Sequence, residues 1–379
     1  MKPPAVNRLR LFNFFYFSLL AIFISFLPVY MDAKGLSASQ IGIVMGTGGL
    51  VGIVSQPFWG VVSDRLRSVK PIATALTVAS AAIGFFLFRE DSFLFLLLFT
   101  GLMYFFLLPV DPLAESLNIR TAEAHGVSYG AIRTFGAVGY AAASLAAGWL
   151  LLRFETGVLA YAFVGVAAAC AWSVSFVKDA PASGAPLTLR SLREFFAGGK
   201  TLAFFALVLL TAIPHRMNDV YLGVYLKRLG GGDELVGLAW FLSASSEIAV
   251  FAVSYWWLRK GREYGLIAIA TLLYVAKFAL TAWVRDPVAV AWLQLFQAFT
   301  FPLFYSAAVQ YLFRIVPEEW RATGQTVLAV LFFGVSGIAA SYAGGWLFEA
   351  LGGSRMYLVM AGVAAAAFGF SLISAKRRG

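Results

Sequence analysis

Residues 60–67 read Gly60-Val61-Val62-Ser63-Asp64-Arg65-Leu66-Arg67 and form a short polar connector between two apolar segments. The segment before the connector covers residues 40–62, and the segment after it covers residues 71–88. A run of about 20 mostly apolar residues makes a helix long enough to span the hydrocarbon layer of a bilayer. Two such runs joined by a short basic connector indicate a pair of antiparallel membrane-spanning helices.

The composition of the chain agrees with a membrane protein. Of the 379 residues, 60% are hydrophobic and 13% are charged, whereas a soluble domain is about half apolar and a quarter charged. The net charge of +10 is spread over short connectors and forms no single basic face, which argues against a nucleic-acid partner. Cys170 is the only cysteine, so no disulfide forms within the chain.

Hydropathy predicts twelve membrane spans. They cover residues 11–31, 40–62, 71–88, 93–114, 131–152, 157–177, 201–226, 235–258, 264–283, 288–314, 323–349 and 355–374. These segments are too long and too uniformly apolar for the alternating strands of an outer-membrane barrel. The predicted fold class is therefore an all-α membrane protein, with the lipid bilayer as its surroundings.

Lys and Arg are distributed unevenly between the two sets of connectors. If both termini are cytoplasmic, 19 of these residues lie in inside connectors and 7 lie in outside connectors. The seven outside residues are Lys34, Arg89, Arg153, Lys227, Arg228, Arg285 and Arg355. Cytoplasmic loops carry the excess of positive charge, so we predict a multi-pass protein of the cytoplasmic (inner) membrane with both termini inside.

The longest polar connector divides the spans six and six. It covers residues 178–200 and is rich in Pro, Gly and Ser, which is typical of a linker. We therefore predict one six-helix bundle over residues 1–177, a cytoplasmic linker, and a second six-helix bundle over residues 201–379.

The two predicted bundles also share short sequence matches. At an offset of 195 residues, the first bundle's Val29-Tyr30-Met31 and Gln40-Ile41-Gly42 match Val224-Tyr225-Leu226 and Leu235-Val236-Gly237. With one residue of slippage, Gly136-Ala137-Val138-Gly139 and Gly148-Trp149-Leu150 match Gly334-Val335-Ser336-Gly337 and Gly345-Trp346-Leu347. Two parallel repeats of six helices with a binding site between them are typical of the major facilitator superfamily, which the chain resembles.

The connector at residues 60–67 resembles the signature loop of that superfamily. The resemblance implies that Asp64 and Arg65 take part in gating the cytoplasmic side, because the carboxylate can cap a neighbouring helix or pair with cations. The plain alternative is a basic turn that only follows the positive-inside rule.

Several motifs are similar to the lactose permease and phenylpropionate permease group. They are Phe15-Tyr16-Phe17, Pro28-Val29-Tyr30, the run at residues 35–42, Gln56-Pro57-Phe58-Trp59-Gly60, Pro112-Leu113-Ala114-Glu115-Ser116-Leu117 and the run at residues 129–139. The similarity covers most of the chain and is looser in the second half.

This resemblance implies that Glu115 and Arg133 bind the solute as an ion pair and that Tyr140 stacks on it. Arg133 can donate a forked pair of hydrogen bonds to solute oxygens while Glu115 orients it. Asp111 lies one helical turn from Glu115 on the same face. The predicted solute-binding residues are Arg133, Glu115, Asp111, Tyr140, Tyr16 and Asn13. The alternative is that both charges lie at cytoplasmic helix ends and only snorkel or close a gate.

The second half carries a further set of charges within its spans. Asp219 follows Arg216 by three residues and His215 by four, so all three can meet on one helix face. Glu247 and Lys277 lie mid-span in two later segments. The predicted coupling residues are Glu247, Asp219, Lys277, Arg216 and His215. Glu247 is the first candidate for the proton and Asp219 the second, and we expect Glu247 to alternate between a Lys277-paired state and a desolvated, unpaired state. A static network of ion pairs is the alternative.

The tenth span departs from the resembled group. Gln297 and Thr300 occupy the positions where lactose permease carries the His and Glu of its proton site, and neither residue titrates in the physiological range. The proton has therefore moved to another carboxylate, or coupling is absent.

We expect a monomeric secondary transporter that moves a small polar solute by alternating access, with proton-coupled symport as the preferred mode. By resemblance, the solute is a sugar, a nucleoside or an aromatic acid. The alternatives are an efflux carrier, a uniporter or a non-transporting membrane receptor. With only two histidines and no catalytic motif, we predict no enzyme activity, no metal site and no cofactor.

Overall fold

The computed structural model describes residues 4–179, 199–252 and 261–376, and every regular element in these ranges is helical. Twelve helical segments within them are long and apolar enough to span a membrane, which confirms the predicted number of spans and the all-α fold class. Most of the predicted linker, residues 180–198, lies outside the described residues.

The first six spans are built from eight helices. They are α1 (Pro4–Leu20), α2 (Phe26–Ala33), α3 (Ala38–Leu66), α4 (Lys70–Leu87), α5 (Phe93–Phe106), α6 (Val110–His125), α7 (Gly130–Arg153) and α8 (Val158–Ser175). A π-helical turn at Ala21–Ser25 joins α1 to α2 within one span. Such turns inside helices are frequent at functional sites.

The described part of the last six spans has a similar organisation. Its helices are α10 (Gly199–Arg228), α11 (Asp233–Ala252), α13 (Glu263–Trp283), α14 (Pro287–Trp292), α15 (Gln297–Ile315), α16 (Arg321–Ala329), α17 (Ser336–Leu351) and α18 (Gly353–Lys376). A 3₁₀ turn at Leu293–Phe296 joins α14 to α15, another at Glu318–Trp320 precedes α16, and a π-helical turn at Val330–Val335 joins α16 to α17.

The fourth span is longer than predicted. We expected it to end at residue 114, but α5 and α6 form one segment that continues to His125. The polar residues of α6 end the hydropathy signal without ending the helix, which stops only where Gly126 takes a positive φ of 59°. Glu115 therefore lies within a helix, about 15 Å from its end, whereas Arg133 lies in the first turn of α7, so the snorkelling alternative stays open for the arginine.

Small residues let helices of the first bundle approach closely. A side-chain carbon at Gly139 of α7 would lie 2.1 Å from the carbonyl oxygen of Phe14 in α1. At Gly136 it would lie 2.6 Å from the ring of Phe17. Backbone contact through glycine is a general way to pack membrane helices, and here it places α7 against the face of α1 that carries Phe17.

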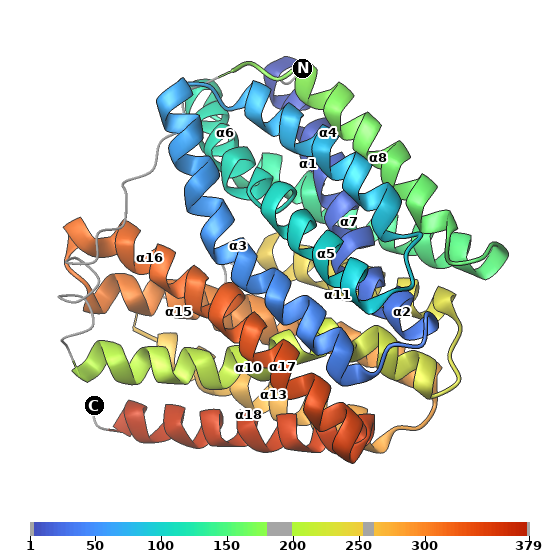
Figure 1. Cartoon of the computed structure of the whole chain (residues 1–379). Helices are drawn as coiled ribbons and strands as arrows, with labels where there is room; N and C mark the ends of the chain where they lie inside the picture. The colour runs from blue at the N-terminus through green and yellow to red at the C-terminus, as the bar shows by residue number, and fades with distance from the viewer. Residues whose placement is uncertain (1–3, 180–198, 253–260, 377–379) are drawn as a thin grey trace.

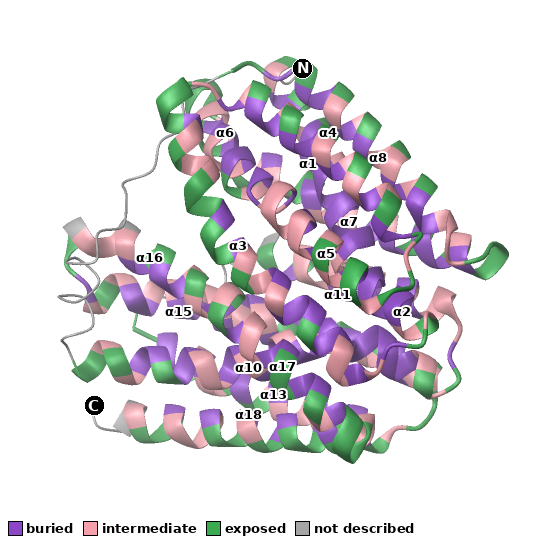
Figure 2. Cartoon of the chain, viewed as in Figure 1, coloured by how far each residue is buried: buried purple, intermediate pink, exposed green. Residues whose placement is uncertain are grey.

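The outer faces of the helices carry large apolar side chains. Trp283 is 73% exposed, Val54 is 67% exposed and Leu94 is 66% exposed. Figure 2 shows such exposed positions along α18 and α3, while buried positions lie between the helices. Exposed apolar surface of this extent is typical of a protein that meets lipid.

The two sets of six spans meet closely at the end of the molecule opposite the termini (Figure 1). There, α3 packs along α17 and α7 packs along α11. A side-chain carbon at Gly42 would lie 2.3 Å from the carbonyl oxygen of Ser341. Gly148 and Gly237 make a similar backbone contact between α7 and α11.

Among the polar contacts that join the bundles at this closed end, two involve carboxylates. Arg228 of α10 pairs with Asp32 of α2 at 2.7 Å. Glu349 of α17 accepts hydrogen bonds from the Ser37 hydroxyl at 2.9 Å and from the Ser39 backbone N–H at 3.0 Å, which caps the start of α3 across the interface. Both contacts would have to break for this end to open.

At the other end, α3 and α16 diverge toward the side that carries both termini (Figure 1). Asp64 and Arg65 lie there in the last turn of α3, and both side chains are exposed. Neither makes a side-chain hydrogen bond or ion pair with any residue that the structure describes. Among the described residues, the predicted gating residues therefore have no partner at this end of the molecule.

Candidate solute-binding and coupling site

Arg133 and Glu115 form a direct ion pair in the first bundle. Arg133 Nε lies 2.5 Å from Glu115 Oε1, and the side chains are 31% and 24% exposed. The guanidinium carbon lies 3.8 Å from the centre of the Phe17 ring, a cation–π contact. The pair is thus fixed by a carboxylate and an aromatic face but retains exposure through which it can meet a solute.

Polar residues behind Glu115 hold its orientation. Tyr129 donates a hydrogen bond to Glu115 Oε2, and the Asn118 amide donates to the same oxygen at 3.4 Å. Asn118 also exchanges amide hydrogen bonds with Asn13 at 2.7 and 3.0 Å. Asn13 is fully buried and bonded in this way, so in this conformation it supports Asn118 behind the ion pair, and its contact with solute stays a prediction.

The other two predicted contacts of this bundle take different positions. Tyr16 is fully buried, and its hydroxyl donates to the Leu107 carbonyl oxygen at 3.4 Å, so it too belongs to the core. Asp111 lies close enough to Arg133 to interact electrostatically with it. One oxygen of Asp111 is buried without a hydrogen-bond partner among the described residues, and such atoms mark strained or functional sites.

Tyr140 lies where the two bundles face each other. Its hydroxyl shares a 2.6 Å hydrogen bond with Ser25 of the π-helical turn in the first span. Its ring meets Trp240 of α11 edge to face at 6.2 Å, a contact between the bundles. Asp219 and Glu247 of the second bundle are near enough to act electrostatically on Tyr140, so the aromatic pair lies close to the charges of the second bundle.

His215, Arg216 and Asp219 meet on one face of α10, as their spacing predicts. Arg216 Nη1 lies 2.7 Å from Asp219 Oδ2, and His215 Nε2 lies 3.7 Å from the same oxygen. His215 Nδ1 is 3.2 Å from the Tyr274 hydroxyl, and the imidazole stacks on Phe301 with ring centres 5.2 Å apart. Asp219 therefore has a charged arginine partner on one side and an aromatic cage around its histidine on the other.

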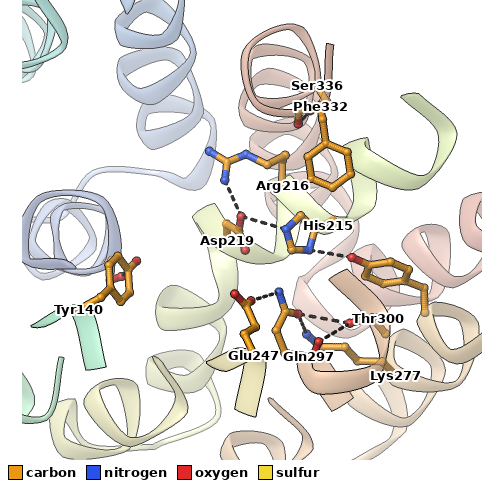
Figure 3. A network of polar contacts seen from close by, with 12 residues as sticks. Tyr140, His215, Arg216, Asp219, Glu247, Lys277, Gln297, Thr300, Phe332 and Ser336 are labelled. Atoms are coloured by element: carbon orange, nitrogen blue, oxygen red, sulfur yellow. Dashed lines mark hydrogen bonds and ion pairs between the residues drawn. The ribbon is translucent and has the colours of Figure 1, made fainter. Parts of the chain in front are cut away.

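Glu247 and Lys277 do not touch, although the sequence suggested a paired state. The Lys277 ammonium donates to Gln297 Oε1 at 2.8 Å, and Gln297 Nε2 donates to Glu247 Oε1 at 2.8 Å. Figure 3 shows this line of three side chains from α13, α15 and α11 below the Asp219 group. The amide fits between the two charges because its carbonyl accepts from the cation while its NH₂ donates to the carboxylate.

Thr300 lies beside this chain of contacts. Its hydroxyl donates within the helix to the Phe296 carbonyl at 3.1 Å and to the Gln297 carbonyl at 3.3 Å. Its position next to Gln297 agrees with the departure noted in the tenth span, where neutral groups replace titrating ones.

Sequence reasoning missed three contributors to the site. Asn118 and Tyr129 hold Glu115, and Trp240 faces Tyr140 from the second bundle. The spacing of Asn118, three residues after Glu115, was a usable signal because such residues share a helix face. The sequence around Trp240 did not indicate its position, because an isolated tryptophan in an apolar span is typical of a core residue or of a lipid contact.

No group of three or more His, Cys, Asp or Glu side chains in the described ranges is arranged to hold a metal ion. Glu115 and Asp219 each have an arginine beside them, and Glu247 is bonded to the amide of Gln297. The chemistry available to these residues is hydrogen bonding, charge pairing and proton exchange.

Known proteins similar to this chain are membrane transporters. The chain is 27% identical to the maltose permease of Geobacillus stearothermophilus over 355 residues, which cover 92% of this chain and 90% of that protein. It is 26% identical to the uncharacterized transporter YwbF of Bacillus subtilis (strain 168), with coverage of 92% and 88%. It is 23% identical to the raffinose permease of Escherichia coli, again over 92% and 88%.

Solved structures share the fold at lower sequence identity. The nucleoside transporter NupG superimposes with a TM-score of 0.88 at 16% identity, covering 99% of this chain and 100% of the other. A bacterial homolog of the human lysosomal transporter Spinster, in an inward-facing and occupied conformation, gives a TM-score of 0.72 at 15% identity, with coverage of 99% and 98%.

The family assignment rests on nearly the full length of the chain. The family model described as "MFS_1 like family" matches residues 6–359. The twelve helical spans and the permease relatives agree with it. The chain belongs to the MFS_1 like family of the major facilitator superfamily and is a multi-pass integral membrane transporter, not an enzyme.

Proposed function

We propose that this transporter takes up a sugar-like polyhydroxyl solute by alternating access and that uptake is coupled to protons. The observation that carries the solute proposal is the Arg133–Glu115 pair, which joins two candidate membrane spans, stacks on Phe17 and keeps about a quarter to a third of its side-chain surface exposed. A solute hydroxyl can accept from the guanidinium and donate to the carboxylate, so the pair matches a ligand that offers both roles.

Unpaired polar atoms near the bundle interface support a polyhydroxyl ligand. Asp111 Oδ1 is an acceptor, and Arg216 Nε and Trp240 Nε1 are donors; all three are buried without hydrogen-bond partners among the described residues. The names of the maltose and raffinose permeases favour a sugar. The name of NupG keeps a nucleoside as second choice, and an aromatic acid is third.

The solute class can be tested with purified protein in proteoliposomes. Counterflow exchange would be measured across a panel of mono-, di- and trisaccharides, nucleosides and aromatic acids. We expect exchange of at least one saccharide. Exchange of only nucleosides or only acids would contradict the sugar proposal while leaving the transporter assignment intact.

For the coupling proton, we propose Glu247 as carrier and Asp219 as the second candidate. Glu247 accepts a hydrogen bond from a neutral amide and touches no cation, whereas Asp219 is held by Arg216 at 2.7 Å. A carboxylate without a direct cationic partner can gain and lose a proton without leaving an arginine unpaired inside the protein. Asp219 would have to give up its ion pair to do the same.

The Glu247→Gln variant tests this assignment. It should lose accumulation driven by a pH gradient while counterflow exchange continues, because exchange needs no net proton movement. Glu234→Gln, in the first turn of the same helix at the closed end, is the matched control and should accumulate normally. Gradient-driven accumulation by Glu247→Gln would remove Glu247 from the coupling role.

The second candidate function is uncoupled transport, as a uniporter or an efflux carrier. It is favoured by Gln297 and Thr300, which are neutral where the resembled group has titrating residues. If the unmodified protein exchanges a solute but never accumulates it in response to an imposed pH difference, the uncoupled alternative replaces symport.

We also propose that both termini and residues 178–200 are cytoplasmic, that the bundles of residues 1–177 and 201–379 rock about the site, and that this conformation opens to the cytoplasm. The 19-to-7 distribution of Lys and Arg supports the orientation. A single cysteine at position 185 in a Cys170→Ser background should resist an impermeant thiol reagent in intact cells. Labelling of this cysteine from outside the cell would contradict the proposed orientation.

A further inference from the structure

A pocket of about 390 Å³ lies at the closed end of the second bundle, away from the site described above. Three arginines from three different helix ends line it: Arg228 at the end of α10, Arg285 between α13 and α14, and Arg355 at the start of α18. The remaining lining residues are Tyr225, Leu229, Leu351, Gly352, Gly353 and Ser354.

The positive charge of this pocket is only partly neutralised. Arg228 pairs with Asp32 at 2.7 Å. Arg285 donates to the hydroxyl of Ser354, which is neutral. Arg355 makes no hydrogen bond or ion pair with any described residue. Three guanidinium groups therefore share one carboxylate, and like charges held close together favour an added anion.

Neighbouring carboxylates are committed to other contacts. Asp286, next to Arg285 in the chain, accepts from the backbone N–H groups of Val288 and Ala289 at the start of α14. Glu349, close to the pocket in sequence, accepts from Ser37 and Ser39 of the other bundle. Neither is available to pair with Arg285 or Arg355 without breaking a helix cap.

The backbone of the pocket adds to its preference for an anion. Gly352 has a φ of 82° and precedes the first turn of α18, whose N-terminal N–H groups carry partial positive charge. Guanidinium groups donate two parallel hydrogen bonds to a phosphate, and helix N-termini bind phosphate through backbone donors. These donors are of the kinds that bind phosphate elsewhere.

We propose that this three-arginine pocket binds a phosphate group, carried either by an anionic lipid headgroup or by a free phosphate ion. Trp283, which ends α13 two residues before Arg285, is 73% exposed, and tryptophans are enriched at the membrane–water interface. The pocket is therefore at the depth of lipid headgroups. In the proposed orientation, the pocket contains three of the seven Lys and Arg residues of the outside connectors. Outside connectors of membrane proteins generally carry few Lys and Arg residues.

Arg228 links the pocket to the contact between the bundles. The same side chain lines the pocket and pairs with Asp32 of the first bundle. A phosphate bound to Arg285 and Arg355 would compete with Asp32 for Arg228, so its occupancy would affect how firmly the closed end is held.

The test uses purified full-length protein in a neutral detergent and measures thermal unfolding at constant ionic strength. Short-chain phosphatidylglycerol, phosphatidylcholine with the same chains, and inorganic phosphate are titrated separately. A bound ligand raises the unfolding temperature by mass action. We expect stabilisation by phosphatidylglycerol that exceeds stabilisation by phosphatidylcholine. Equal stabilisation by inorganic phosphate would identify a soluble ion as the source.

The variants decide whether the pocket is responsible. Arg285→Gln/Arg355→Gln should raise the half-saturating concentration about tenfold or more, the scale of a lost charged contact. Arg355→Gln alone should raise it less and should fold normally, because that side chain makes no contact to lose. Arg153→Gln, exposed at the same end of the first bundle, is the control and should bind like the unmodified protein. Equal stabilisation of the double variant and the control would overturn the proposal.

Discussion

Two charge networks in the two bundles use the same residue types in different ways. In the first bundle, Arg133 and Glu115 touch directly at 2.5 Å and are partly exposed. In the second bundle, Lys277 and Glu247 are separated by the amide of Gln297, and Lys277 is only 1% exposed. The first arrangement can exchange one partner for a solute, while the second leaves a carboxylate whose charge is not cancelled by contact.

This difference suggests a division of labour between the bundles. A direct pair in a partly exposed position is held less tightly than a buried one, so a solute with both donors and acceptors can bind beside it. In the buried pair, Lys277 and Glu247 are each bonded to the neutral amide of Gln297. A change in the protonation of Glu247 would therefore alter this hydrogen-bonded chain. We therefore interpret the first network as recognition and the second as coupling.

Arg133→Lys gives the largest expected effect on the recognition side. The lysine keeps the charge but lacks the planar fork and the broad face that lies on Phe17. Loss of a charged hydrogen bond costs about 2 kcal/mol, and with the lost fork the solute affinity should fall on the order of a hundredfold. The measurement is the half-saturating solute concentration in counterflow.

Arg153→Lys is the matched control for that variant. Arg153 lies in the last turn of the same helix, is exposed, and should tolerate the change. If Arg133→Lys binds solute as tightly as Arg153→Lys, the Arg133–Glu115 pair is a structural contact and the comparison of the two networks loses its recognition half.

Gln297→Leu tests the coupling side with the next largest effect. The side chain of Lys277 would lose its hydrogen-bond acceptor while buried, and leaving a charged group unsatisfied costs about 1.5–3 kcal/mol. We expect a lower unfolding temperature and loss of pH-driven accumulation. Gln294→Leu in the same span is the control, since Gln294 bonds only to a backbone carbonyl of its own turn. Equal behaviour of the two variants would show that the bridging amide is dispensable.

Much of the fold could be predicted because the length of each apolar run reflects the thickness of the hydrocarbon layer that a helix must span. Twelve spans follow from runs of about 20 apolar residues. The fourth span shows the limit of that signal: α6 is held by packing and by its bonds to Asn13 and Tyr129, so its polar second half stays helical.

The candidate site was predictable where spacing along one helix fixes geometry and was not where helices meet. His215, Arg216 and Asp219 come together because residues three and four apart share a helix face. The insertion of Gln297 between Lys277 and Glu247 involves three helices, and helix rotations set it. The hydrogen bonds of Asn13 could not be predicted from spacing, because its partner Asn118 lies 105 residues away in another helix.

Tyr140→Phe probes the boundary between the two networks and should have a moderate effect. The change removes the hydrogen bond to Ser25 but keeps the ring that meets Trp240. A neutral hydrogen bond contributes about 1 kcal/mol, so solute affinity should fall about fivefold. Tyr140→Ala should lose more, because it also removes the aromatic surface. If both variants lose the same amount, the hydroxyl and not the ring is the part of Tyr140 that matters.

Thr300→Val should have the smallest effect, and it tests whether the proton path involves Thr300 or the contacts of Glu247. Thr300 stands where the resembled group has a titrating carboxylate, but here its buried hydroxyl donates only to neutral oxygens, chiefly carbonyls of its own helix turn. Valine has nearly the same shape as threonine, and the carbonyls that lose the hydroxyl belong to a helix, where they have backbone partners. The free energy of unfolding should therefore change by about 1 kcal/mol or less. Accumulation driven by a pH gradient should persist, in contrast to Gln297→Leu. Loss of coupling in Thr300→Val with intact counterflow would return the proton path to the tenth span and make the Glu247 network a fixed structural element.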